Sequence, residues 1–293
     1  MRKTFVFLLL CCCALAVQAG PQNSGVQENS PPGYTLKKHY KPRLRSSFAL
    51  VYDVKSKRPL YAKHEDAVVP IASISKLMTA MVMLDARLPL DQEITVTRAD
   101  KDRLKYSRSR IRIGTTLTRR ELLKLALMAS ENRAAAALAR TYPGGTKAAV
   151  AMMNFKAYQL GMDDTHFLDP TGLNSGNVST AQDLVKLVLA AKHYGLIRQF
   201  TTTTTHQVEV EGRRRPLHFI NTNPLVRSNY WDIGLSKTGY ISEAGRCLVM
   251  EATIKDRPVV IVLLDSWGRL SRIGDANRVK RWMERALMPL THG

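Results

Sequence analysis

The order of hydrophobic patterns along the chain constrains the fold most strongly. Residues 48–62 read as two short strands joined by a turn, and residues 70–192 repeat apolar side chains mainly at helical spacing. Strand-like runs return between residues 201 and 264, and a last amphipathic helix is predicted over about 270–287. Strands, a block of helices, more strands and a closing helix predict an α+β fold rather than alternating βαβ units.

Capping residues predict where several of the helices begin. Thr118, with Glu121 three residues later, fits a capping box, and Thr146 is expected to cap a helix that ends at Gly161. Ser179 or Thr180 is expected to cap the next helix. The threonine run 201–205 is rich in β-branched side chains and predicts the start of a strand.

The first nineteen residues have the pattern of a secretory signal peptide. Arg2 and Lys3 are followed by an apolar run over residues 5–17, and residues 17–19 resemble a cleavage site before Gly20. The apolar run is too short to span a bilayer comfortably. The sequence therefore predicts an exported, periplasmic protein with residues 1–19 removed.

The mature chain is expected to begin with a flexible, basic arm over residues 20–46, which is rich in Pro, Gly, Asn, Gln and Lys. The net charge of +20 suggests a polyanionic neighbour, and the arm could contact an anionic envelope or membrane surface. No nucleic-acid motif is present, so nucleic acid is not expected as a partner. The basic runs 108–112 and 213–215 are short and lack interleaved aromatics, which favours an interpretation as solvated surface.

Cysteine usage predicts a core without disulfides. Three of the four cysteines lie in the predicted signal peptide, and only Cys247 remains in the mature chain. Its apolar neighbours favour a buried thiol that packs as a small hydrophobic residue.

Ser73 and Lys76 stand three residues apart at the start of a predicted helix, so their side chains share one face. A serine becomes a good nucleophile only when a neighbouring group takes its proton, and a lysine can do so only with a lowered pKa. The simpler alternative is that Ser73 caps the helix and that Lys76 is a solvated charge. The pair alone does not separate the two.

Two further short motifs follow in the chain. Ser130, Glu131 and Asn132 lie at a predicted junction between two helices, and Lys237, Thr238 and Gly239 lie on a predicted strand. A second Ser-x-Asn at residues 175–177 is too far from Ser73 in sequence to fit the same pattern. Ser-x-x-Lys, Ser-x-Asn and Lys-Thr-Gly in this order and at these intervals form the pattern of serine penicillin-binding proteins and β-lactamases.

The stretches 71–79, 130–135 and 236–240 resemble the low-molecular-mass penicillin-binding proteins. Within that family the chain is most similar to D-alanyl-D-alanine endopeptidases of the penicillin-binding protein 7 type, because Glu131 occupies a position where related carboxypeptidases commonly have Gly. The chain also ends soon after the closing helix, which leaves no room for their additional β-domain. The resemblance implies an antiparallel sheet flanked by helices, an all-helical subdomain, and a catalytic domain over residues 47–290.

The resemblance also implies the catalytic roles. Ser73 would attack a D-alanyl carbonyl in peptidoglycan and form an acyl-enzyme, and Lys76 would act as its general base. Ser130 would relay a proton to the leaving amine, and Asn132 would orient the substrate and the lysine. β-Lactam antibiotics would acylate Ser73 as covalent inhibitors.

The Lys-Thr-Gly strand is implied to bind substrate. Lys237 and Thr238 would bind a carboxylate, and Gly239 would let the substrate strand lie close. The backbone N–H groups of Ser73 and Tyr240 would form the oxyanion hole. No metal or cofactor is implied, and the seven histidines are scattered without ligand spacing.

Three other functions remain open at this point. A carboxypeptidase would use the same chemistry on a free D-alanyl-D-alanine terminus. A class A β-lactamase would need a glutamate that activates the deacylating water, and only Glu209 and Glu211, in a strand-like stretch, lie between Asn132 and Lys237. A non-catalytic envelope-binding protein would not need Ser73, Lys76 and Ser130 together.

Overall fold

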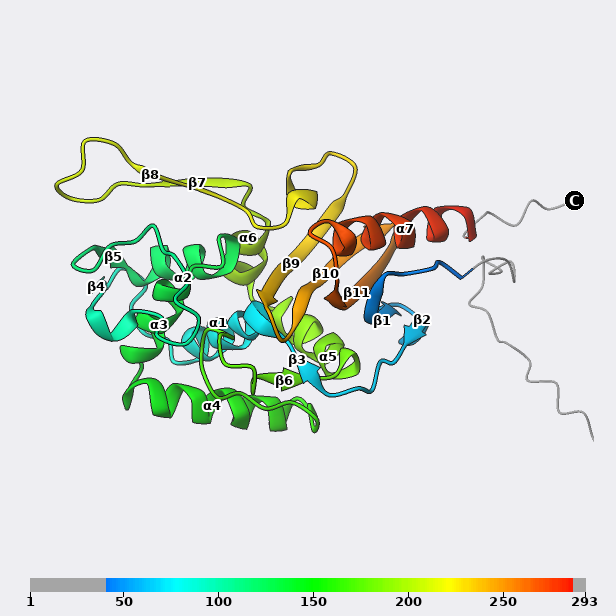
Figure 1. The fold of residues 1–293 in the computed structure, drawn as a ribbon, viewed down its shortest axis with the longest axis horizontal. Coiled ribbons are helices and arrows are strands. Elements are labelled where there is room, and N and C mark those ends of the chain that lie inside the picture. The colour runs from blue at the N-terminus through cyan, green and yellow to red at the C-terminus, as the bar shows by residue number, and fades with distance from the viewer. Residues whose placement is uncertain (1–40, 287–293) are drawn as a thin grey trace, which may run out of the picture.

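A five-stranded antiparallel sheet forms the centre of the molecule (Figure 1). In this computed structural model, which describes residues 41–286, the strand order is β2–β1–β11–β10–β9. The bounds of the strands are β1 Ser46–Asp53, β2 Arg58–Lys63, β9 Asp232–Ile241, β10 Gly245–Ile254 and β11 Arg257–Ser266. β1 pairs with β11, for example Val51 with Ile261, so the two ends of the domain close into one sheet. The predicted α+β class with an antiparallel sheet is confirmed.

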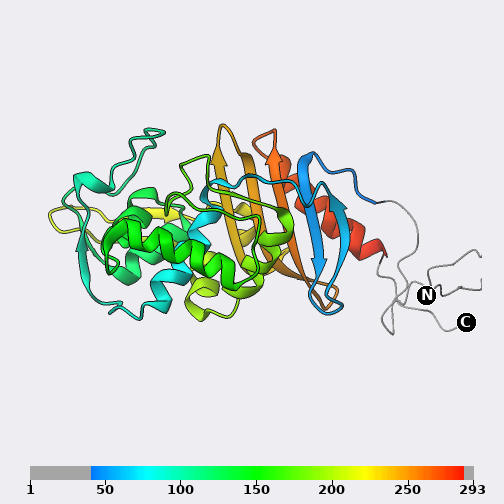
Figure 2. The same cartoon turned by 90° about the horizontal axis from the view of Figure 1, so that it is seen from below.

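Helices cover both faces of this sheet, and β11 shows how its sequence allows this. Val259, Ile261 and Leu263 pack in the cluster that contains α7 (Ser271–Ala286), because side chains alternate between the faces of a strand. Val260, Val262 and Leu264 belong instead to the larger cluster that contains α5 (Ala181–Ala191). Figures 1 and 2 show the two helices on opposite sides of the sheet. A strand with an unbroken apolar run, as β11 has from Val259 to Leu264, fits a sheet covered on both sides.

The helical subdomain is built around α1 (Ser75–Asp85), which is buried from Ser75 to Met83. Four other helices lie in this part of the molecule, with bounds α2 Arg119–Met128, α3 Asn132–Arg140, α4 Gly145–Gln159 and α6 Gly195–Thr202. Three two-stranded pairs complete the described fold, namely β3 (Val69–Pro70) with β6 (Val178–Ser179), β4 (Glu93–Thr95) with β5 (Thr116–Thr118), and β7 (Thr205–Val208) with β8 (Leu217–Ile220). The predicted helix block at the centre of the chain is confirmed.

The helix starts test the capping predictions. The side chains of Thr118 and Thr180 cap α2 and α5, accepting from the backbone N–H groups of Glu121 and Asp183. The prediction for Thr146 was wrong, since α4 already begins at Gly145 and its cap is Gly144 with a left-handed φ of 82°. The glycine pair makes this turn without strain, so no hydroxyl cap is needed.

Only Thr205, the last residue of the threonine run, lies in a strand, where it begins β7; α6 and β8 were not predicted. Thr201 and Thr202 end α6, and the hydroxyl of Thr202 donates to the carbonyl of Arg198 one turn earlier. Ile197 and Phe200 are buried on the same helix and fix it against the core. Tertiary packing therefore overrides the strand preference of these β-branched residues.

The predicted signal peptide, most of the predicted arm, and Leu287 at the predicted end of the last helix lie outside the described residues. The last part of the arm segment does belong to the domain. Leu44 is buried, and the backbone N–H groups of Arg45 and Ser46 donate to the carboxylate of Asp275 on α7. None of the helices within residues 41–286 combines the length and apolar character needed to cross a membrane.

Candidate active site

Ser73 lies where a short 3-10 helix, η1 (Ala72–Ile74), leads into α1. Its side chain is 9% exposed, and its hydroxyl lies 3.3 Å from the carbonyl of Thr171. The preceding Ala72 has a left-handed φ of 49°, which is unusual for a residue with a side chain. A Cβ at Gly172 would lie 1.9 Å from the carbonyl oxygen of Ala72, so only glycine fits there. Backbone packing thus holds Ser73 in place.

Lys76 is 1% exposed and its ammonium nitrogen has three close partners. Nζ lies 2.8 Å from Ser73 Oγ, 2.7 Å from Asn132 Oδ1 and 2.6 Å from the carbonyl of Thr171. Burial lowers the pKa of Lys76 from 10.5 to about 7, against the opposing influence of nearby carboxylates. An amine that is partly neutral at pH 7 and touches a hydroxyl can accept its proton.

The Ser130–Asn132 motif forms the turn between α2 and α3. Ser130 takes a left-handed φ of 58°, which lets α3 begin directly at Asn132. Asn132 accepts from Lys76 through Oδ1 and donates through Nδ2 to Ser107 Oγ, 2.8 Å away. Glu131 is also buried and accepts from the backbone N–H of Arg110. The motif therefore holds the loop before β5 beside Lys76.

The Lys237–Gly239 motif lies on the edge strand β9 and faces the other two motifs. Lys237 is 1% exposed, and its Nζ donates to Ser130 Oγ at 2.8 Å and to the carbonyl of Thr238 at 2.7 Å. Thr238 Oγ1 donates to Thr222 Oγ1 at 2.7 Å. Because Lys237 donates to Ser130 Oγ, the proton of Ser130 remains free for another acceptor.

Gly239 brings β9 against the start of α1. A Cβ at this position would lie 3.0 Å from the Cβ of Ala72, from the carbonyl of Ile71 and from the backbone nitrogen of Ser73. The glycine therefore has a role within the protein itself, beside the expected one toward substrate. Tyr240 follows at the rim, 56% exposed, with the guanidinium of Arg246 over its ring at 4.4 Å.

Positive charge is concentrated beneath this strand. The pKa of Lys237 lies well below its usual range because of burial and because of the charges of Lys76 and Arg272. Arg272, from α7, donates to the carbonyls of Gly239 and Cys247, and burial lowers its pKa to about 10. Cations in such a dry site favour an anionic group on a ligand.

Four residues of this network were not found from the sequence. Thr171 supplies the carbonyl that Lys76 and Ser73 share, Ser107 holds Asn132, Thr222 contacts Thr238, and Arg272 lies beneath β9. None of the four belongs to one of the three motifs, and only the tertiary fold brings them to the site.

The second Ser-x-Asn, at residues 175–177, serves the structure instead. Asn177 is fully buried, donates to Ser75 Oγ and to the carbonyl of Asp169, and accepts from the backbone N–H groups of Leu168 and Asp169. It thereby shapes the loop that presents Thr171. Cys247 is also fully buried, and burial raises the pKa of its thiol to about 11, as expected for a packing residue.

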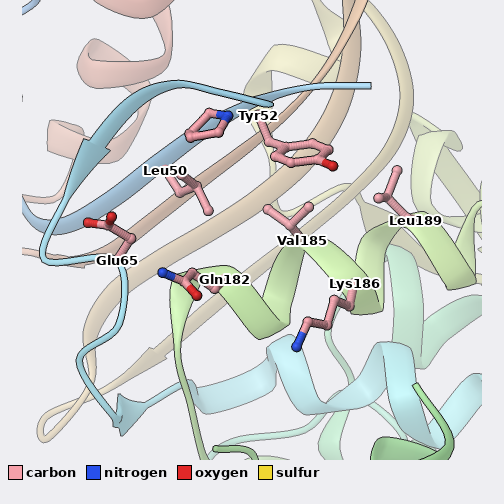
Figure 3. Close-up of a pocket in the computed structure, with 8 residues that line it drawn as sticks. Leu50, Tyr52, Glu65, Gln182, Val185, Lys186 and Leu189 are labelled. Carbon is pink, nitrogen blue, oxygen red and sulfur yellow. The ribbon is translucent and has the colours of Figure 1, made fainter. Parts of the chain in front are cut away.

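A separate pocket of about 320 Å³ lies between β1 and α5 (Figure 3). Val185 and Leu189 project from α5 toward Leu50 and Tyr52 of β1. None of the motif residues lines this pocket, so it is not part of the candidate site. Within the described part of the chain, no cluster of three His, Cys, Asp or Glu side chains could hold a metal ion.

Residues 35–267 match the D-alanyl-D-alanine carboxypeptidase family, peptidase family S11. The chain belongs to this family. The predicted membership of the serine DD-peptidases is thereby confirmed, and with it the class of enzyme.

The most similar relatives of this S11 peptidase include two proteins named D-alanyl-D-alanine endopeptidase. The one from Escherichia coli K12 is 47% identical over 83% of this chain and 78% of its own length. The one from Pseudomonas aeruginosa PAO1 is 44% identical over 97% of this chain and 89% of its own length. A D-alanyl-D-alanine carboxypeptidase from Streptomyces sp. K15 is 33% identical over 76% of this chain and 81% of its own.

Solved structures of similar proteins show the same fold. The Streptomyces K15 DD-transpeptidase superimposes on the S11 peptidase with a TM-score of 0.77 at 30% identity, covering 83% of this chain and 98% of that one. Penicillin-binding protein D2 from Listeria monocytogenes, in a cefotaxime-bound form, gives a TM-score of 0.72 at 29% identity, with coverage of 83% and 99%. The predicted fold class is confirmed at this level too.

Proposed function

We propose that this chain is a serine DD-peptidase that hydrolyses D-alanyl cross-links of peptidoglycan as an endopeptidase, through an acyl-enzyme on Ser73. One observation carries the proposal: the buried Lys76, with a pKa near 7, lies 2.8 Å from the Ser73 hydroxyl. A neutral amine at this distance takes the hydroxyl proton as Ser73 attacks the D-alanyl carbonyl carbon. The names of the two similar endopeptidases support the same substrate class.

The remaining steps use the other motif residues. Negative charge on the attacked oxygen is stabilised by the backbone N–H groups of Ser73 and Tyr240. Ser130, whose oxygen accepts from Lys237, donates its own proton to the leaving amine as the peptide bond breaks. The proton held by Lys76 then replaces the one that Ser130 lost, which leaves Lys76 neutral again. Water attacks the ester carbon, Lys76 takes a proton from this water and passes it to the Ser73 oxygen, and the ester bond breaks.

Lys237 and Thr238 bind a carboxylate of the substrate. Asn132 orients Lys76 and the substrate peptide. Support comes from the charge beneath β9, because Arg272 places a second buried cation against the backbone of Gly239. A carboxylate that enters this site replaces the interaction of Lys237 with the carbonyl of Thr238. It also forms charge-assisted hydrogen bonds, which are stronger than neutral ones.

Penicillin and other β-lactams acylate the same serine and remain attached. Three carboxylates lie near Lys76, and each accepts from backbone N–H groups: Asp169 from Thr171 and Gly172, Asp102 from Leu104 and Lys105, and Glu131, through Oε1, from Arg110. These bonds tie each carboxylate to the protein backbone, which favours an inhibited enzyme over a β-lactamase. Rapid, repeated turnover of penicillin by the purified protein would contradict this.

The choice of endopeptidase over carboxypeptidase is tested with purified cross-linked muropeptides. Wild type should convert dimers into monomers, and Ser73→Ala should not. Release of free D-alanine with the dimers left intact would replace the proposal with the carboxypeptidase function.

We also propose that the enzyme works outside the cytoplasm, with residues 1–19 acting as a cleaved signal peptide and the segment from Gly20 up to the buried Leu44 as a basic arm. The apolar run 5–17 and the basic residues 37–45 support these two assignments. The mass of the protein recovered from the periplasm should correspond to a chain that begins at Gly20. An intact N-terminus would contradict cleavage.

A further inference from the structure

The fold brings together the two basic runs of the sequence, which lie about one hundred residues apart. Arg112 from the loop before β5 and Arg213, Arg214 and Arg215 from the tip of the β7–β8 hairpin line one hollow of about 670 Å³. Arg110 lines the adjoining pocket, together with Arg112 and Arg213. We call these five side chains the arginine groove. Figure 1 shows the hairpin reaching out over the helical subdomain, beyond β4 and β5.

The groove is an organised surface. Arg110 donates to the carbonyl of His218 on β8, and its guanidinium lies 5.8 Å from the centre of the Phe219 ring. The backbone N–H of the same residue is held by Glu131. The loop with the first basic run is therefore fastened on one side to the hairpin and on the other to the Ser130–Asn132 motif.

The charge of the groove is not neutralised within the described residues. All five arginines are exposed, and none of them forms an ion pair with a carboxylate in residues 41–286. Only one acidic residue, Glu211, lines the adjoining pocket. Clustered like charges repel, and the planar guanidinium groups match the two oxygens of a carboxylate. The groove is therefore suited to an anionic polymer.

The β7–β8 hairpin connects the groove physically to the candidate active site. Thr222, just after β8, accepts a hydrogen bond from Thr238, and its backbone N–H donates to the carbonyl of Met128. Arg214 and Thr222 are eight positions apart, so at about 3.3 Å per residue the chain places Arg214 at most about 26 Å from Thr222, which contacts Thr238. A long substrate cleaved at Ser73 can reach the groove with a neighbouring segment.

We infer that the arginine groove is a second binding site for the polymeric substrate, which holds carboxylate groups of neighbouring stem peptides while one cross-link occupies the active site. This inference rests on the proposed function. It assigns to the two basic runs a role that their sequence alone did not indicate. The site adds affinity for the intact polymer and none for a small soluble fragment.

The test compares Arg213→Gln/Arg214→Gln/Arg215→Gln with the control Arg58→Gln/Lys147→Gln/Arg285→Gln. The control removes three exposed charges whose side chains form no hydrogen bond or ion pair within the described residues. Three rates are measured at low salt: cross-link loss from insoluble peptidoglycan stripped of phosphate polymers, cleavage of a soluble muropeptide dimer, and acylation by fluorescent penicillin. The groove variant should lose about tenfold on the insoluble polymer and less than twofold on the other two substrates, and the control should stay at wild-type rates throughout.

Several outcomes would overturn the inference. Equal losses on the polymer and on the soluble dimer would show damage to the active site, and no loss on the polymer would show that the groove does not bind it. Binding of polyphosphate, with no difference between variants on stripped peptidoglycan, would assign the groove to a phosphate polymer. Failure of the proposed function is separate, since wild type would then fail to cleave the soluble dimer at all.

Discussion

Lowering the pH should switch off acylation of Ser73 with a midpoint set by Lys76. Burial lowers the pKa of this amine from 10.5 to about 7, and it can take the serine proton only when it is neutral. At pH 7 about half of the molecules then hold a neutral Lys76, and at pH 5 about one in a hundred do. The acylation rate should therefore fall about 50-fold from pH 7 to pH 5 and level off above about pH 8.

A lysine with its ordinary pKa would behave differently. Only about one molecule in three thousand would be neutral at pH 7, and the rate would rise about tenfold with each pH unit up to pH 10. The pH at which the acid limb lies thus measures how far burial has lowered the pKa of Lys76. The assay is single-turnover acylation by fluorescent penicillin between pH 5 and pH 9, followed on the acid limb.

A variant that removes a nearby negative charge tests the direction in which the midpoint moves. The carboxylate of Glu131 raises the pKa of Lys76, so Glu131→Gln should move the acid midpoint to lower pH, while the amide oxygen still accepts from Ser109 and Arg110. Asp91→Asn, which removes an exposed carboxylate, should leave the midpoint unchanged. A rate that still rises tenfold per unit between pH 7 and pH 9 would refute the lowered pKa of Lys76, and a midpoint moved upward by Glu131→Gln would refute Lys76 as the base.

Three further predictions concern the frame of the site. Gly172→Ala should lower the free energy of unfolding by about 3 kcal/mol, because Gly172 has a φ of 77° and the new Cβ would clash with the carbonyl of Ala72. Gly161→Ala should lower it by about 1 kcal/mol, because Gly161 has a similar φ of 66° but open space around it. Urea titration of both variants checks this, and equal costs would contradict the close approach. Ser107→Ala removes the acceptor of Asn132 Nδ2 and should slow penicillin acylation about tenfold at an unchanged urea midpoint; an unchanged rate would show that Ser107 does not position Asn132. The Cys247 thiol, buried and with its pKa raised to about 11, should react with a thiol reagent at pH 8 only after unfolding, and prompt reaction of the native protein would contradict its burial.

Local hydrophobic patterns in the sequence located most strands and helices. They failed where contacts between distant segments determine the structure. The two strands expected within residues 48–62 are found within a few residues as β1 and β2, and the later strand-like runs contain β9, β10 and β11, because buried strands leave runs of apolar residues. The pairing of β1 with β11 joins segments about two hundred residues apart, and no local pattern encodes it. The α6 helix was missed because its threonines favour strands in isolation and are helical only through packing of Ile197 and Phe200.

The candidate site shows the same division. Its motif residues could be named from sequence because each motif is short and local, and the structure brings Ser73, Lys76 and Asn132 into direct contact. From the sequence we could say only that Lys76 needs a lowered pKa in order to act as a base. Whether its pKa is lowered depends on its burial, which is a property of the folded structure. The roles of Arg272 and the arginine groove could not be predicted from the sequence for the same reason, because both depend on contacts between distant segments.

The most direct test of the account is the mass of the protein after reaction with penicillin, followed by peptide mapping. Wild type should gain one penicilloyl group, located on Ser73, and should keep it over many minutes. The neighbouring hydroxyl of Ser75, which donates to the carbonyl of Ala72, provides the control. Ser75→Ala should still be acylated, and Ser73→Ala should not. Acylation at any other residue, or an unchanged mass in wild type, would contradict the claim that Ser73 and Lys76 form the acylating pair.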